Sequence, residues 1–234
     1  FCQSADRPLV NQRLKDRLFE MLPSPSLLMR FPPLHLQSTH RRAKLFFLGL
    51  FAVALTACSE PTEFVGSDIT SGNIGQGWTL TDHQGEARQA DSFPGKASVV
   101  FFGFTQCPDV CPAALAEVAT ALQLMGEQAK DVQVLMITVD PERDTPPLLG
   151  EYLGAFDQGL PTKFLGLRGS PENLRQTASA FRAYYAKSPT PDGSYTMDHS
   201  ASFYLFDPQG KARVLLSSQA GPEALAQDLK ALLE

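Results

Sequence analysis

Two cysteines, Cys107 and Cys111, are separated by three residues in the run C-P-D-V-C-P. If the helix expected after them begins near Pro108, both side chains lie on one face of its first turn, because positions i and i+4 share a face. Their Cα atoms would be about 6 Å apart, which suits a disulfide or two sulfur ligands to one ion. A helix N-terminus also lowers the pKa of a thiol and favours the thiolate. The spacing predicts a redox-active or soft-metal site.

A third ligand is expected, since two thiolates alone suit Cu(I) or half of a zinc site. His35 and His40 fall in an N-terminal segment that we assign to a leader below, and His83 falls in a predicted turn, where a solvated histidine is the usual state. His199, in the run M-D-H-S, comes just before a strand predicted to join the same sheet as the cysteines. Two cysteines and one histidine, without a fourth such ligand, favour trigonal copper over structural zinc.

Carboxylates stand near both parts of this predicted site. Asp140 and Asp144 lie in the run D-P-E-R-D, which follows a buried strand and would reach the surroundings of the cysteines. Helix capping or a surface ion pair is the alternative role for this loop. Asp198 precedes His199 and is expected to orient its ring, as carboxylates beside metal-binding histidines often do.

The segment R-R-A-K-L-F-F-L-G-L-F-A-V-A-L-T-A-C, residues 41–58, is typical of an export signal. Its basic start leads into an uncharged apolar run, Leu45 to Leu55, which is shorter than the roughly 20 residues of a membrane span. The ending L-T-A-C resembles a bacterial lipobox, in which Cys58 would become the lipidated N-terminus. Cleavage without lipidation and an uncleaved anchor are the alternatives. We expect residues 1–57 to be a leader, with a lipoprotein signal peptide over 29–57 and a stretch upstream of the true translation start over 1–28.

This leader decides how the four cysteines are used. Cys2 lies in the leader and Cys58 would carry lipid, so Cys107 and Cys111 remain as the thiols of an exported domain. A disulfide between residues so close in sequence would constrain little of the unfolded chain, so the pair is expected to serve chemistry rather than stability. The predicted location is the periplasmic side of a bacterial membrane, with inner and outer membrane both open.

Charge excludes one class of partner. Of the 20 basic and 25 acidic residues, eight and three precede residue 58, so the remainder of the chain carries a net charge of −10. Nucleic-acid binding needs a basic surface that neutralises phosphates, and it is therefore not expected.

The elements that must position the site follow from apolar patterns. Residues 58–75 are polar and rich in glycine and serine, which predicts a flexible tether before a domain over 76–234. Strands are predicted at 78–81, 97–104, 132–139, 200–206 and 211–217, and the chain is predicted to turn at 83–85, after the first of them. Helices are predicted at 112–130, 145–156 and 171–185 and at the C-terminus. This order predicts an α/β fold whose mixed sheet is flanked by helices, with the cysteines at the carboxyl end of a strand.

Three blocks in this order resemble the SCO/SenC family from about Gly77 onward: G-K-A-S-V-V-F-F-G-F-T-Q-C-P-D-V-C-P, then V-D-P-E-R-D-T-P, then D-H-S-A-S-F-Y-L-F-D-P-Q-G. Members of that family are thioredoxin-like, membrane-anchored copper chaperones that help to assemble the dinuclear copper centre of cytochrome c oxidase. The resemblance implies a thioredoxin-like sheet with an N-terminal hairpin extension. It also implies that Cys107, Cys111 and His199 bind copper, and that the partner is oxidase subunit II or another periplasmic copper protein. The two thiolates favour Cu(I), and Cu(II) stays open as a second form of the cargo.

Two functions therefore remain open. The first is a copper metallochaperone, which is not an enzyme. The second is a thiol–disulfide reductase that keeps the copper-binding cysteines of the oxidase reduced, with His199 incidental. One cysteine pair can serve both, because a dithiol can bind copper or exchange electrons.

Overall fold

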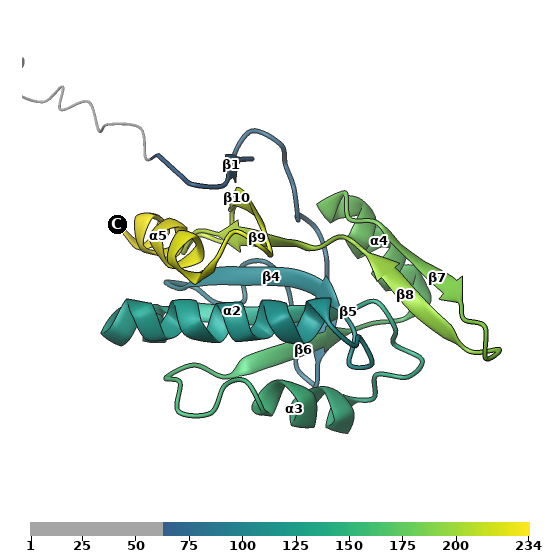
Figure 1. Cartoon of the computed structure of the whole chain (residues 1–234). Coiled ribbons are helices and arrows are strands. Elements are labelled where there is room, and N and C mark those ends of the chain that lie inside the picture. The colour runs from purple at the N-terminus through teal and green to yellow at the C-terminus, as the bar shows by residue number, and fades with distance from the viewer. Residues whose placement is uncertain (1–62) are drawn as a thin grey trace, which may run out of the picture. The chain divides into compact units, whose positions relative to one another are not determined.

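The computed structural model describes residues 63–234 (Figure 1). The predicted leader, its signal peptide and Cys58 lie outside the described residues and stay predictions. Residues Glu60–Glu234 form one compact unit. Both clusters of buried apolar side chains lie within this unit, so it has a core of its own.

The centre of the domain is an eight-stranded sheet in the order β1-β10-β9-β4-β5-β6-β2-β3. The strands are β1 Ser67–Asp68, β2 Leu80–Asp82, β3 Ala87–Arg88, β4 Ala97–Gly103, β5 Val132–Thr138, β6 Phe164–Arg168, β9 Ser202–Phe206 and β10 Ala212–Ser217. β4, β5 and β6 pair in parallel, whereas the other pairs are antiparallel. The predicted mixed sheet and the β2–β3 hairpin are confirmed.

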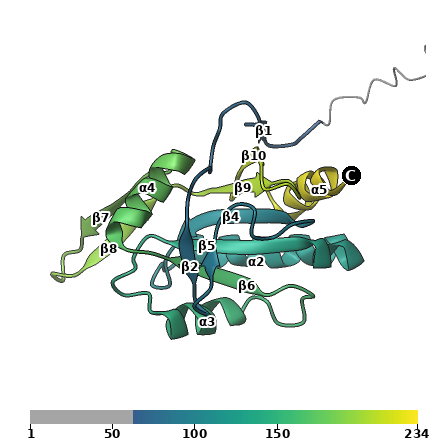
Figure 2. The same ribbon diagram turned by 180° about the vertical axis from the view of Figure 1, so that it is seen from behind.

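Helices cover both faces of this sheet (Figures 1 and 2). They are α2 Val110–Met125, α3 Pro146–Gly154, α4 Pro171–Phe181 and α5 Pro222–Leu233, and the 3₁₀ helix η1 Gly126–Asp131 extends α2. Buried side chains of α2, α3 and α5 share one core cluster, whereas those of α4 belong to the other, together with Cys111 from the start of α2. Successive residues of β4 alternate between the two clusters, as the period of a strand requires: Val99 and Phe101 face one, and Val100 and Phe102 face the other.

A second, two-stranded sheet lies beyond the main one, beside α4 (Figure 1). It pairs β7 Tyr185–Pro189 with β8 Tyr195–His199, antiparallel, with Tyr185 opposite His199. The predicted helix over 171–185 instead ends at Phe181, because Arg182 adopts the left-handed conformation with φ of 53°. The chain then enters β7. The sequence predicted neither this hairpin nor β6.

The segment predicted as a flexible tether is partly built into the domain. Within it, β1 pairs with β10, and the backbone N–H groups of Val65 and Gly66 donate hydrogen bonds of 2.7 and 3.0 Å to the buried carboxylate of Asp228. Ile74 is buried as well. The compact domain therefore begins before the predicted boundary at residue 76, and its docked segment uses backbone contacts that sequence polarity does not reveal.

Candidate metal centre

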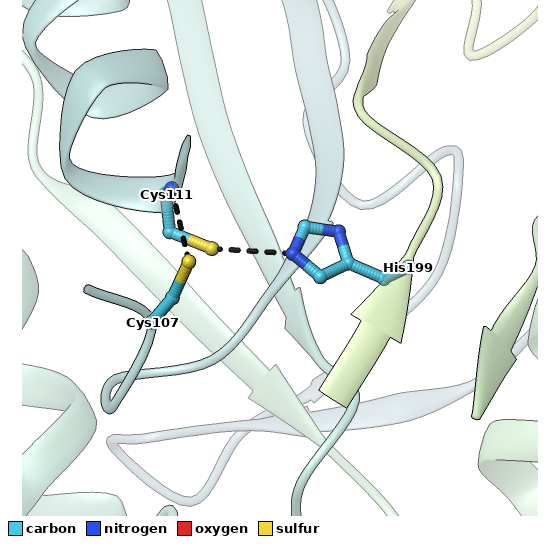
Figure 3. Close-up of side chains that lie close together, drawn as sticks. All are labelled: Cys107, Cys111 and His199. Atoms are coloured by element: carbon cyan, nitrogen blue, oxygen red, sulfur yellow. Dashed lines mark hydrogen bonds between the residues drawn. The ribbon is translucent and has the colours of Figure 1, made fainter. Parts of the chain in front are cut away.

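Three elements bring the predicted ligands together (Figure 3). Cys107 lies in the loop after β4, Cys111 lies in the first turn of α2, and His199 is the last residue of β8. One ligand atom from each residue lies within 4.8 Å of the other two. Cys111 Sγ is 3.5 Å from His199 Nε2, and Cys107 Sγ accepts a hydrogen bond of 3.3 Å from the backbone N–H of Cys111.

The cysteines meet in a different way from the one expected. Helix α2 begins at Val110 rather than near Pro108, so Cys107 precedes the helix. The loop is held by a hydrogen bond of 3.3 Å from Cys107 N to the carbonyl of Phe104. The side chain of Asp109 makes no capping hydrogen bond, and the sulfur of Cys107 accepts from an N–H of the first turn instead. The two sulfurs converge through this loop and not through a shared helical face.

Burial sets the protonation of the inner thiol. Cys111 is 1% exposed. Burial raises the pKa of its thiol, and a hydrogen bond with the backbone of Phe104 opposes that rise only in part. The expectation that the helix N-terminus lowers this pKa is therefore wrong for Cys111. Its sulfur must give up a proton before it binds a metal as a thiolate.

The ring of His199 is oriented by the backbone. Its Nδ1 lies 3.1 Å from the carbonyl oxygen of Ser200. A carbonyl only accepts hydrogen bonds, so Nδ1 carries a proton, and in the neutral ring Nε2 then presents its lone pair to Cys111 Sγ. Phe104 packs edge to face against the ring, with centroids 5.9 Å apart. Asp198 is exposed and makes no hydrogen bond to His199 in the described part of the chain, so the expected orienting role belongs to Ser200.

Asp144 supports the start of the cysteine loop through hydrogen bonds. Its buried carboxylate accepts hydrogen bonds from the hydroxyl of Thr105 at 2.6 Å, from the Thr105 N–H, and from the hydroxyl of Thr138 at 2.5 Å. Thr105 stands two residues before Cys107, and Thr138 ends β5. Asp144 thus ties the start of the cysteine loop to the sheet, without contacting a sulfur itself.

Asp140, also buried, supports the hairpin that carries His199. Its carboxylate forms an ion pair with Arg143 and accepts a hydrogen bond of 3.1 Å from the hydroxyl of Tyr195 at the start of β8. The two aspartates of the D-P-E-R-D run therefore hold residues near the metal ligands: Asp144 holds Thr105 near Cys107, and Asp140 holds Tyr195 in the strand of His199. The alternative of a surface ion pair does not describe them, because both carboxylates are buried.

A cavity of about 290 Å³ opens onto the site. It is lined by Phe104, Cys107, Pro108, Asp109, Val110, Thr196, Met197, Asp198, His199 and Ala201. Cys107 is partly exposed, whereas Cys111 is buried. A partner molecule can therefore reach the outer sulfur and the histidine from solvent.

Sequence reasoning missed Gly103, which ends β4. A Cβ at this position would lie 3.1 Å from Cys111 Sγ, closer than an ordinary contact. The signal was present as the one glycine in the buried run V-V-F-F-G-F, since a glycine inside a strand marks a close approach. His83, expected to be solvated, is half-buried and accepts a hydrogen bond of 3.1 Å from Gly166 N. It belongs to the packing of β6.

The chemistry of the donors fits copper. Two sulfurs and one imidazole nitrogen form a soft set of three, which suits Cu(I), whereas structural zinc is almost always bound by four protein ligands. The described residues bring no fourth cysteine, histidine or carboxylate into this group. The orientation of His199 by the Ser200 carbonyl is also the arrangement typical of metal-binding histidines.

Known proteins resemble the chain over most of this domain. A family model described as SCO1/SenC matches residues 67–234. A SCO2-like protein of Rickettsia felis is 34% identical over 159 residues, which are 67% of this chain and 76% of that protein. The structure of Bradyrhizobium japonicum ScoI with copper bound is 43% identical with a TM-score of 0.60, and the match covers 67% of this chain and 98% of that one. Arabidopsis thaliana ScoI with copper bound is 32% identical with a TM-score of 0.60, over 72% and 98% of the two chains.

Proposed function

Because the chain belongs to the SCO1/SenC family and has its thioredoxin-like fold, we propose that it is a copper metallochaperone for assembly of the dinuclear copper centre of cytochrome c oxidase. One observation carries the proposal: Cys107, Cys111 and His199 converge to within 4.8 Å from three separate elements. Related structures with the same fold have copper bound, which supports copper as the cargo.

The site suits a cargo that must be released as well as held. Two sulfurs and the Nε2 of His199 would bind copper, leaving room for a ligand from the acceptor, because three-coordinate Cu(I) can accept another soft donor. Cys107 lies at the open cavity and would be the first ligand to be replaced. The buried thiol of Cys111 loses its proton when copper binds and takes a proton back on release. Binding and transfer would thus be ligand-exchange reactions coupled to the release and return of thiol protons.

The acceptor in this proposal is oxidase subunit II, with another periplasmic copper protein as the other candidate. The test mixes the copper-loaded unit Glu60–Glu234 with the metal-free soluble domain of subunit II, separates the proteins, and measures copper in each. The proposal predicts copper transfer, and addition of a mild oxidant to the separated acceptor should then produce the dinuclear-centre absorption, because Cu(I) itself does not absorb visible light. Copper that stays on the donor would count against the proposal. So would acceptor loading from free copper, or from a copper-treated His199→Ala variant, that is as fast as loading from the parent protein.

The second candidate is a thiol–disulfide reductase, favoured by the contrast between a partly exposed and a buried thiol. Cys107 would attack a disulfide of the oxidase and form a mixed disulfide. Cys111 would then attack Cys107 Sγ, so that the partner leaves with both thiols reduced and a Cys107–Cys111 disulfide remains. Incubation of the reduced protein with oxidised subunit II tests this. Two results together would establish the reductase in place of the chaperone. The His199→Ala variant would reduce subunit II as well as the parent does, and the parent would transfer no copper.

A lipid anchor on the periplasmic side of a bacterial membrane is part of the proposal and rests on the sequence around Cys58. Among residues 63–234, no helix has the length and apolar character needed to cross a membrane. Replacement of Cys58 by alanine should move the protein from the membrane fraction to the soluble fraction. A Cys58→Ala protein that still sediments with membranes would contradict the anchor.

A further inference from the structure

One short loop contacts the supports of both parts of the site. Residues 140–144 connect β5 to α3. At one end, Asp144 holds Thr105 beside the cysteine loop. Asp140, at the other end, and Arg143, next to Asp144, both hold Tyr195 in β8, the strand that ends in His199. The cysteines and the histidine come from segments far apart in sequence, and this loop is a direct link between them.

Tyr195 is gripped at three points. Its hydroxyl donates a hydrogen bond of 3.1 Å to Asp140, and its carbonyl accepts one of 2.9 Å from Arg143 Nη1. The Arg143 guanidinium lies 3.8 Å from the ring centroid, and Lys187 Nζ lies 4.5 Å from the same centroid. Cations over an aromatic face stabilise it, more so where water is partly excluded. Lys187 is held in turn by Glu142 at 2.7 Å, so the ring is fixed to the loop through a second residue.

The strand β8 connects Tyr195 to the metal ligand His199. Tyr195 and His199 are the first and last residues of β8 and point to the same face, because side chains alternate with a period of two. An isolated two-stranded hairpin is at best marginally stable, so β7–β8 needs an outside contact to fix its position. Beside His199, Ser200 N and Tyr184 O anchor the base of the hairpin at 2.9 Å. Two side chains of β8 supply such contacts: Met197 is buried in the core cluster that includes α4, and Tyr195 joins the strand to the loop 140–144.

We propose that Tyr195, held by Asp140 and Arg143, is a positioning residue that sets the place of His199 relative to the two cysteines. The proposal rests on the proposed copper-binding function. The loop 140–144 fixes the separation between the cysteine loop and β8, and the affinity of the site for copper depends on Tyr195 only through His199. Asp140 and Arg143 act in the same way, as partners of Tyr195.

A double-mutant cycle on Cu(I) affinity tests this proposal, using the compact unit Glu60–Glu234 and competition with a chromophoric Cu(I) chelator. Tyr195→Ala should weaken Cu(I) binding by about tenfold or more, the usual effect of losing a residue that orients a metal ligand. Tyr195→Phe keeps the aromatic ring that contacts Arg143 and Lys187 and should lose less. Leu124→Ala, which removes an exposed large side chain near the C-terminal end of α2, is the control and should leave the affinity unchanged.

The informative comparison is in the His199→Ala background. There Tyr195→Ala should change the Cu(I) affinity by less than about twofold, within the scatter of additive behaviour. An equal loss in both backgrounds would show that Tyr195 only stabilises the domain, and no loss in the parent would show that it does not position His199. If His199→Ala alone leaves the affinity unchanged, the three-ligand site is itself wrong and the positioning role falls with it. If instead His199→Ala weakens Cu(I) binding and Tyr195→Ala does not, only the positioning role of Tyr195 is wrong.

Discussion

The sulfur of Cys111 lies 3.5 Å from Nε2 of His199, although 88 residues separate the two in sequence. The contact joins the first turn of α2 to the end of β8, and these two elements belong to different parts of the fold. Because the sulfur is buried and the imidazole nitrogen faces it with its lone pair, a soft cation between them would replace a proton. The copper chemistry of the site is therefore coupled to pH.

The affinity for Cu(I) should rise with pH. Burial raises the pKa of the Cys111 thiol, so this group is protonated at neutral pH and must release a proton on binding. Each proton released multiplies the apparent association constant by about ten per pH unit, and the rise continues until the pH passes the thiol pKa. Competition titrations between about pH 6 and 8 measure the slope. A flat profile would show that the sulfur binds without losing a proton, contrary to the buried thiol seen here.

Gly103→Ala should disturb the inner cysteine. The added Cβ would meet Cys111 Sγ at 3.1 Å and the ring of Phe101 at 3.3 Å. Overpacking of this kind costs about 1–3 kcal/mol in unfolding free energy, and the displaced sulfur should also bind Cu(I) more weakly. Urea unfolding and Cu(I) competition are the measurements. Gly154→Ala is the control, because a Cβ there meets open space. Equal behaviour of the two variants would mean that β4 does not need its glycine.

Asp144→Asn should destabilise the domain. The carboxylate accepts hydrogen bonds from Thr105 and Thr138 and has no donor of its own, whereas an asparagine turns an NH₂ group towards one of these donors. The unsatisfied buried groups should cost about 1–3 kcal/mol in denaturant unfolding. The exposed Asp91 gives the matched control, since Asp91→Asn should change stability by less than about 0.5 kcal/mol. If Asp144→Asn is as neutral as this control, Asp144 does not hold the cysteine loop.

Removal of residues 63–75 should weaken the domain by about 3 kcal/mol or more, because the buried carboxylate of Asp228 loses two backbone donors. The loss is measured by comparing urea unfolding of chains that begin at Glu63 and at Gln76. Asp228→Ala in the shorter chain removes the unsatisfied carboxylate and should recover part of the loss. Equal midpoints for the two chain lengths would show that the segment is only a tether.

Much of the central sheet was predictable, and the reason is burial. The strands β4 and β5 are buried at every residue, so each appears in the sequence as a mostly apolar run that only a few buried polar residues interrupt, such as Ser98 and Gln133. The β9–β10 hairpin is marked by the turn D-P-Q-G. By contrast, β7 reads Y-A-K-S-P and β8 reads Y-T-M-D-H, which are polar strands on the edge of the domain. Their pairing depends on contacts with α4 and the loop 140–144, which no local pattern records.

The ligand residues of the site were predictable for a different reason. Cysteine and histidine are scarce in this chain, so the close cysteine pair could be identified by type and spacing, and two histidines, His83 and His199, fall in the predicted domain as candidate third ligands. The residues that support them are common types. Tyr195 acts on Asp140 across 55 residues, and Thr105 acts on Asp144 across 39, so neither contact has a sequence signal. The start of α2 at Val110 and the raised pKa of Cys111 likewise depend on how the loop packs against β4.

The most direct test of the account is the Cu(I) affinity of His199→Ala in the compact unit Glu60–Glu234, with His83→Ala as the control histidine. His83 lies against β6 and should be dispensable for copper. We predict that the parent binds one Cu(I) per protein and that His199→Ala binds it about 100-fold or more weakly. Loss of a residue that only supports a metal ligand costs up to about 100-fold in affinity, and loss of the ligand itself should cost at least as much. The reduction potential of the cysteine pair should change little. An affinity that His199→Ala leaves equal to that of the parent would contradict the three-ligand copper site.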